Sequence, residues 1–158
     1  GLAARLLPPC TQAAVSALAR TKPVQGETMD DHPNAAMVRK LLDDMNSGNT
    51  QGRADMSADD VEWHEIGRAE PIRGKAALAE RFGMGSGTPP PYEIKGELHD
   101  VIANDDHTIA MASAHATKDG RTFDYKVAEI YHIKDGKVAA RWAFSDDTAA
   151  INDFFKGE

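Results

Sequence analysis

The chain has 158 residues, a length that suits one domain with a sizeable hydrophobic core. Its 18 Lys and Arg against 25 Asp and Glu give a net charge of −7. That balance argues against nucleic acid or an anionic membrane surface as the partner, because both bind cationic patches. No run approaches the roughly 20 apolar residues that span a bilayer, so we expect no membrane partner either.

Residues 1–28 differ in composition from the rest of the chain, being rich in Ala and poor in acids. We expect the domain to cover residues 29–158. The first segment is then either an addition ahead of a native start at Met29 or a leader of the transit or secretory kind. The only cysteine, Cys10, lies in this segment. The domain therefore lacks a disulfide and a thiol nucleophile, which fits a reducing cytoplasm.

Hydrophobic periodicity predicts helices first and strands afterwards, which is an α+β pattern. The Gly- and Pro-rich stretch 83–91 interrupts it and is either a plain connector or a lip over a cavity. In chain order we expect helices at 34–46 and 50–56, a strand at 59–66, a helix at 75–82, strands at 92–103 and 107–117, and a last helix at 148–155.

The stretch 121–147 is predicted to form two long strands joined by a tight turn at Asp135-Gly136, because aromatic and β-branched residues alternate with polar ones on both sides. Residues two apart in a strand share a face. One face would thus carry an acid, a phenol, a cation and a hydroxyl, although the alternation does not say which face points inward. These residues are Tyr125, Glu129 and Tyr131 on the first strand, and Arg141 and Ser145 on the second.

Several motifs in this order resemble the SnoaL-like branch of the nuclear transport factor 2-like superfamily, whose relatives include ketosteroid isomerases and polyketide cyclases. The resemblance covers about residues 35–155. The motifs are VEWHEIG with Pro71 and Gly74 downstream, HDVIANDDHTIA, two KDG turns, and RWAFSDD followed by INDFF. The family implies a cone-shaped, curved antiparallel sheet wrapped by N-terminal helices around an apolar internal pocket, and commonly a homodimer through the outer face of the sheet.

Two positions can be carried over from the isomerases. His64 resembles the position of their catalytic aspartate base, and Glu129 resembles the buried acid of their oxyanion hole. Leu41 stands where those enzymes place the oxyanion tyrosine, and Ala143 stands where related cyclases often carry an aspartate. The family register also places Arg141, Ala143 and Ser145 on the pocket side, with Trp142 and Phe144 outside.

These residues suggest a proton-transfer site in which His64 is the general base, because its ordinary pKa lies near neutrality. Glu129 would orient the ring or, if kept neutral by burial, donate a hydrogen bond. The alternative is that His64 only hydrogen-bonds Glu129 or another polar group of the pocket. Trp63 is expected to pack in the core and not to hold a substrate, because only one of the neighbours Trp63 and His64 can face inward. An internal pair between Arg141 and Glu129 would lower the pKa of the acid and disable it as a donor.

The remaining expectations concern ligands and metals. No cofactor and no metal site are expected, because the six histidines show none of the usual metal-ligand spacings. His99 and His115 lie on neighbouring predicted strands and would contact the ligand if they faced the cavity. The expected ligand-binding residues are Tyr125, Tyr131, Arg141, Ser145, His99 and His115.

Two functions remain open at this point. The first is a cofactor-independent isomerase, cyclase or lyase that moves a proton on a hydrophobic, carbonyl-containing metabolite. The second is a non-catalytic module that uses the same pocket to bind a small hydrophobic ligand, or that serves in dimerisation. The residues present at Leu41 and Ala143 favour the second function, whereas a His64–Glu129 pair in an apolar pocket would favour the first.

Overall fold

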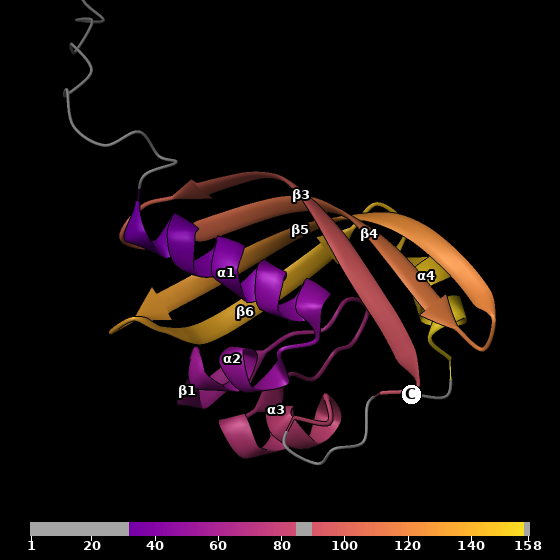
Figure 1. Cartoon of the computed structure of the whole chain (residues 1–158), viewed down its shortest axis with the longest axis horizontal. Helices are drawn as coiled ribbons and strands as arrows, with labels where there is room; N and C mark the ends of the chain where they lie inside the picture. The colour runs from indigo at the N-terminus through magenta and orange to yellow at the C-terminus, as the bar shows by residue number, and fades with distance from the viewer. Residues whose placement is uncertain (1–31, 85–89, 157–158) are drawn as a thin grey trace, which may run out of the picture.

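The computed structural model describes residues 32–84 and 90–156. The segment 1–28 and most of the expected lip at 83–91 therefore lie outside the described residues. The elements in chain order are α1 Pro33–Ser47, α2 Thr50–Asp55, β1 Ser57–Trp63, β2 Ile72–Arg73, α3 Lys75–Arg81, β3 Tyr92–Ala103, β4 Thr108–Lys118, β5 Arg121–Lys134, β6 Lys137–Ser145 and α4 Thr148–Phe154 (Figure 1).

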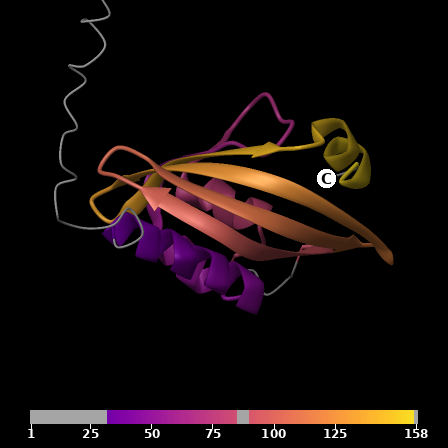
Figure 2. The same ribbon diagram turned by 90° about the horizontal axis from the view of Figure 1, so that it is seen from above.

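The strands form one six-stranded sheet in the order β2-β1-β6-β5-β4-β3. The four long strands β3 to β6 are an antiparallel meander, as expected from the sequence. The sheet is curved, and α1 lies across one of its faces while α4 sits at one end (Figure 2). This arrangement confirms the predicted α+β class with a curved sheet covered by N-terminal helices.

Both KDG sequences form the tight turns that join the long strands. Asp119 and Gly120 have φ values of 52° and 74°, and Asp135 and Gly136 have φ values of 51° and 69°. Two consecutive residues with positive φ define the hairpin turn whose twist matches the flanking strands, and Asp-Gly tolerates this conformation well. The hairpin predicted for 121–147 is thus confirmed, and its turn fixes the register between β5 and β6.

Helix α1 is held at both ends and buries one face. The His32 imidazole caps its start by accepting a hydrogen bond from the Asn34 backbone at 3.2 Å, and Gly48 ends it in the left-handed conformation with φ 73°. Its buried side chains include Ala35, Val38, Leu41 and Leu42, which belong to the main hydrophobic core.

The edge of the sheet formed by β1 and β2 differs from the prediction. The expected strand 59–66 is shorter, since β1 ends at Trp63. The stretch 68–73, between the expected strand and the expected helix at 75–82, was expected to be a loop but contains β2, which pairs antiparallel with β1. Strand β1 pairs in parallel with β6, an arrangement that local patterns cannot reveal because the partners are distant in sequence. Within the described residues, no helix has the length and apolar character needed to cross a membrane.

Candidate functional site

The inner face of the sheet is defined here as the face that α1 covers. On β4 this face consists of small side chains. Ala110, Ala112, Ala114 and Ala116 occupy alternate positions along the strand, and none is more than 5% exposed. Because an alanine side chain is a single methyl group, this row leaves room that Val, Ile or Leu would fill. We call the four residues the alanine floor.

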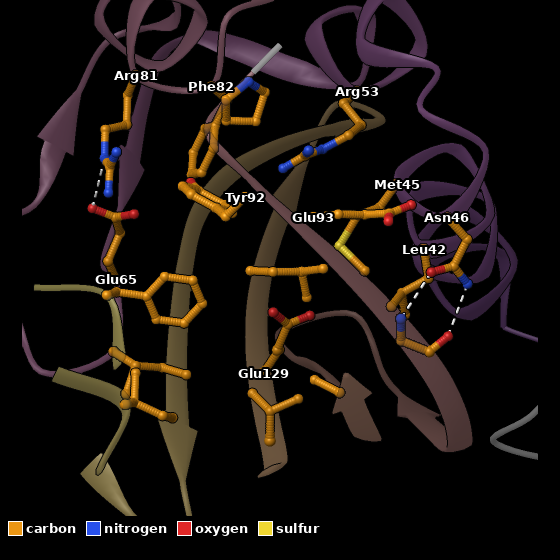
Figure 3. A pocket seen from close by; sticks show the side chains of 18 of the residues that line it. Leu42, Met45, Asn46, Arg53, Glu65, Arg81, Phe82, Tyr92, Glu93 and Glu129 are labelled. Carbon is orange, nitrogen blue, oxygen red and sulfur yellow. Dashed lines mark hydrogen bonds and ion pairs between the residues drawn. The ribbon is translucent and has the colours of Figure 1, made fainter. Parts of the chain in front are cut away.

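A cavity of about 820 Å³ borders the alanine floor at Ala112 and Ala114. Leu41, Leu42 and Met45 of α1 form one wall, and Asn46 anchors the end of that helix to β3 through two 2.8 Å hydrogen bonds with the Gly96 backbone. Figure 3 shows Glu129 on the floor side, while Arg53 and Phe82 reach in from the opposite wall. The other lining side chains are mixed. Apolar or aromatic ones include Trp63, Tyr92, Ile94, Val127, Ile151 and Phe155, and charged ones include Glu65, Arg68, Arg81, Glu93, Lys118 and Asp119.

A buried polar cluster lies at the floor of the cavity. Glu129 of β5 accepts a hydrogen bond from the Tyr131 hydroxyl at 2.5 Å on Oε2, and one from Arg141 Nη2 of β6 on Oε1. The side chains of Glu129 and Arg141 are only 14% and 11% exposed. Strand alternation places Tyr131 on the same face as Glu129, and the β5–β6 register sets it directly opposite Arg141.

Arg141 is fixed by further contacts. Its Nη1 donates to the backbone oxygen of His64 at 3.1 Å, and its guanidinium carbon lies 4.6 Å from the centroid of the Trp63 ring. The guanidinium therefore joins β6 to the end of β1 and stacks on an aromatic face. Its Nε is buried without a hydrogen-bond partner among the described residues.

Charge pairing decides the protonation state of this cluster. Burial alone would raise the pKa of Glu129, but the positive charge of Arg141 and the hydrogen bonds from Tyr131 and Arg141 outweigh it, so the pKa lies below its usual value. Glu129 is thus a carboxylate at neutral pH. Burial and the Glu129 charge together raise the pKa of Tyr131, which stays a hydroxyl donor.

Tyr125 is the second phenol on this face. Burial, followed by the nearby Glu129 charge, raises the pKa of Tyr125 to about 12. Its ring stacks on Phe123 with centroids 5.7 Å apart, and its side chain lines the cavity. A phenol with so high a pKa remains protonated throughout the neutral range and can donate a hydrogen bond to a ligand oxygen.

Four of the residues predicted from the sequence are thus brought together at the cavity, namely Tyr125, Glu129, Tyr131 and Arg141. Their roles in binding or catalysis stay predictions. The Arg141–Glu129 pair considered above is present. It keeps Glu129 ionised, so Glu129 cannot donate a hydrogen bond to the ligand.

His64 lies on the opposite face of the sheet. Its ring stacks on Trp142 with centroids 5.0 Å apart, and Nε2 lies 2.9 Å from the Glu62 carboxylate. Trp63 takes the inward position instead, since neighbouring residues of an extended chain point to opposite faces. His64 therefore does not share a site with Glu129 as expected. The resemblance to the isomerases pointed to position 64, but the inward-facing residue is its neighbour Trp63.

Three further predicted ligand residues also lie away from the cavity lining. His99 Nε2 lies 2.9 Å from Ser113 Oγ, and His115 Nδ1 lies 2.5 Å from Asp124 Oδ1, both on the outer face. Ser145 is 3.3 Å from Thr148 Oγ1 at the start of α4. His99 and His115 thus face away from the cavity, and Ser145, although it shares a face with Arg141, lies beyond the cavity lining at the end of β6.

The structure also adds residues that the sequence reasoning missed. Arg53 of α2 and the ion pair between Arg81 and Glu65, at 3.2 Å, line the cavity. No local pattern marks them, because α2 has no fully buried residue, and Arg81 of α3 is distant in sequence from Glu65 in the loop after β1. Residues 32–84 and 90–156 contain no group of three or more His, Cys, Asp or Glu arranged to hold a metal ion.

Comparison with known proteins agrees with this architecture. The chain matches the family described as SnoaL-like domain over residues 38–141, more than half of its 158 residues. No curated protein sequence matches it.

Solved structures share the fold. Bal32a, from a soil-derived mobile gene cassette, is 24% identical with a TM-score of 0.65 over 78% of this chain and 96% of that one. An NTF2-like protein of unknown function from Burkholderia pseudomallei is 15% identical with a TM-score of 0.66, over 78% and 98%. An LEH-like epoxide hydrolase from M. tuberculosis is 16% identical with a TM-score of 0.62, over 77% and 86%. Identities this low show the shared fold alone.

The first prediction concerns the buried pair. Glu129→Gln should lower the free energy of unfolding at pH 7 by about 3–5 kcal/mol, because Arg141 keeps its charge and loses its counter-ion. The pKa of Glu129 is lowered on folding, so its stabilisation is present above the ordinary value of 4.5 and is lost as pH falls through the folded value. Urea unfolding of both proteins from pH 7 to pH 3 measures this difference.

Glu62→Gln is the matched control, because Glu62 forms a partly exposed pair with Arg73 at 3.1 Å. It should cost less than about 1 kcal/mol. A Glu129→Gln effect no larger than the control, or one that grows on acidification, would contradict the buried ion pair.

Proposed function

This chain belongs to the SnoaL-like domain family, and we propose that it binds a small, largely apolar organic molecule in the cavity between α1 and the sheet. The alanine floor carries the proposal. Protein interiors are normally packed as densely as organic crystals, and a void of this size forfeits the contacts that stabilise a core. Small-molecule sites, by contrast, are largely apolar spaces of about 300–1,000 Å³ with a few oriented polar groups.

The polar groups of the cavity favour a ligand that carries an oxygen acceptor. The Tyr125 hydroxyl is a donor with no hydrogen-bond partner among the described residues, and its raised pKa keeps the proton in place. A carbonyl oxygen is the simplest group that satisfies such a donor inside an apolar space. The proposed ligand is therefore a hydrophobic molecule with at least one carbonyl-type oxygen.

Filling the floor tests this function. Ala112→Leu should raise the dissociation constant of 2-acetylnaphthalene, a neutral aromatic ketone, at least about tenfold, because the larger side chain occupies the ligand's space. It should not lower the free energy of unfolding, since the added carbons gain contacts in an empty space. Isothermal titration calorimetry and urea unfolding measure the two effects.

The matched control is Ala128→Leu, the same substitution on the neighbouring strand. Ala128 pairs with Met111 and so faces away from the alanine floor. This variant should bind the ketone within about twofold of the parent chain. Equal binding by both variants would place the ketone outside the cavity and overturn the proposal.

A proton-transfer enzyme is the second candidate, and the ionised Glu129 favours it. With His64 on the outer face, Glu129 is the cavity's candidate base, held in one position by Tyr131 and Arg141. It would accept a proton from a carbon next to the ligand carbonyl, or from a water molecule, while the Tyr125 hydroxyl donates to the carbonyl oxygen. The lowered pKa of Glu129 weakens it as a base, which is why ligand binding stands first.

Hydrogen exchange distinguishes the two candidates. An enzyme of this kind should speed the exchange of the α-protons of 2-tetralone for deuterium in D₂O, followed by proton NMR. Glu129→Gln should reduce that acceleration by about 10²–10⁴-fold, the usual contribution of a positioned base, while Glu62→Gln should retain it. Exchange at the buffer rate with the parent chain would leave binding as the function.

We also propose a homodimer and a cytoplasmic location, both of which were expected from the sequence. A homodimer through the outer face is supported by Phe144, a large apolar side chain that is 56% exposed there. A cytoplasmic location rests on the absence of cysteine from the domain.

A further inference from the structure

Arg53 stands out among the charged residues that line the cavity. It extends from α2 toward the space beside Phe82, as Figure 3 shows. Its guanidinium carbon lies 5.1 Å from the centroid of the Phe82 ring. The aromatic face orients the cation but supplies neither a negative charge nor hydrogen-bond acceptors.

The acids near Arg53 are engaged elsewhere. Glu129 binds Arg141 and Tyr131 through its two oxygens. Glu65 pairs with Arg81 at 3.2 Å. Within residues 32–84 and 90–156, no side chain forms an ion pair or a hydrogen bond with the Arg53 guanidinium.

The other cations on the lining have partners, and so does Glu93. Glu93 pairs with Lys95 at 3.1 Å. Lys118 Nζ donates to the Lys156 backbone oxygen at 3.0 Å. Among the cations that line the cavity, Arg53 is thus the one without an ion pair or hydrogen bond of its guanidinium within residues 32–84 and 90–156, in a chain whose net charge is −7.

A guanidinium taken partly out of water without an anion is unfavourable, because it gives up hydration and gains no counter-charge. Burial lowers the pKa of Arg53, which reflects this cost. Arginine nevertheless stays protonated in proteins, so the charge is retained and must be balanced by water or by something that enters the cavity. An arginine kept in this position fits a ligand that brings the missing negative charge.

We propose that the molecule bound in the cavity is an organic anion whose carboxylate pairs with Arg53 while its apolar body lies over the alanine floor. The proposal rests on the ligand-binding function above and narrows it to the class of hydrophobic carboxylic acids. The planar guanidinium presents paired N–H groups that match the two oxygens of a carboxylate. Phe82 then holds the guanidinium plane from one side.

Two ligands of nearly the same shape test this directly, namely 2-naphthoate and 2-acetylnaphthalene. They differ in a carboxylate oxygen that replaces a methyl group. Titration calorimetry on the full chain should show the acid binding at least about tenfold more tightly than the ketone, as expected for a charge-assisted hydrogen-bonded pair. Arg53→Gln should abolish this preference and leave ketone binding within about twofold.

Arg73→Gln is the matched control, because it removes an equal charge from the exposed pair with Glu62. It should retain the preference for the acid. Arg53→Lys should retain only part of it, since an ammonium keeps the charge but lacks the planar fork. Circular dichroism confirms that each variant is folded.

The NMR signal of the Arg53 Nε–H group gives a second readout that needs no substitution at this residue. It should shift on addition of 2-naphthoate and stay in place with 2-acetylnaphthalene. Equal affinity for the two ligands in the parent chain, or a preference that survives Arg53→Gln, overturns the anion assignment and leaves the ligand-binding function standing. Loss of both ligands in a folded Arg53→Gln protein also overturns it, because Arg53 would then only support the wall. Failure of both ligands to bind the parent chain overturns the ligand-binding function itself.

Discussion

The ion pair between Glu129 and Arg141 sets the character of the whole cavity. It lies on the inner face of two neighbouring strands, and removing either partner would leave the other charge buried and uncompensated. Arg141 neutralises the negative charge of Glu129, which is the acid that the β5–β6 hairpin places on the inner face beside the cavity. A polar group of a ligand therefore needs other partners, among which are the Tyr125 hydroxyl and the Arg53 guanidinium.

Local rules account for the part of the site that the sequence predicted correctly. The Asp135-Gly136 turn requires positive φ at two residues, and this fixes the register of the hairpin. Strand alternation then sets Glu129 and Tyr131 on one face. The pairing of Tyr131 with Arg141 follows from the same register, so the cluster could be predicted before its inward direction was known.

The parts that could not be predicted depend on contacts between distant segments. His64 follows directly after β1, and a shift of one residue exchanges the two faces of a strand, so the resemblance to the isomerases did not distinguish Trp63 from His64. The parallel pairing of β1 with β6 settles that choice. Arg53 was missed because its long side chain reaches the cavity from a short helix without a buried face.

Titration of the Glu129 carboxyl by ¹³C NMR measures the charge state on which the cavity depends, with Glu129→Gln identifying the signal. We expect the carboxyl to stay ionised from pH 7 down past the ordinary value of 4.5, because Arg141 and Tyr131 stabilise the charged form. A midpoint above 4.5 would contradict it. Glu129 would then be an acid kept neutral by burial, Arg141 would lack its counter-ion, and the division of charge in the cavity described here would be wrong.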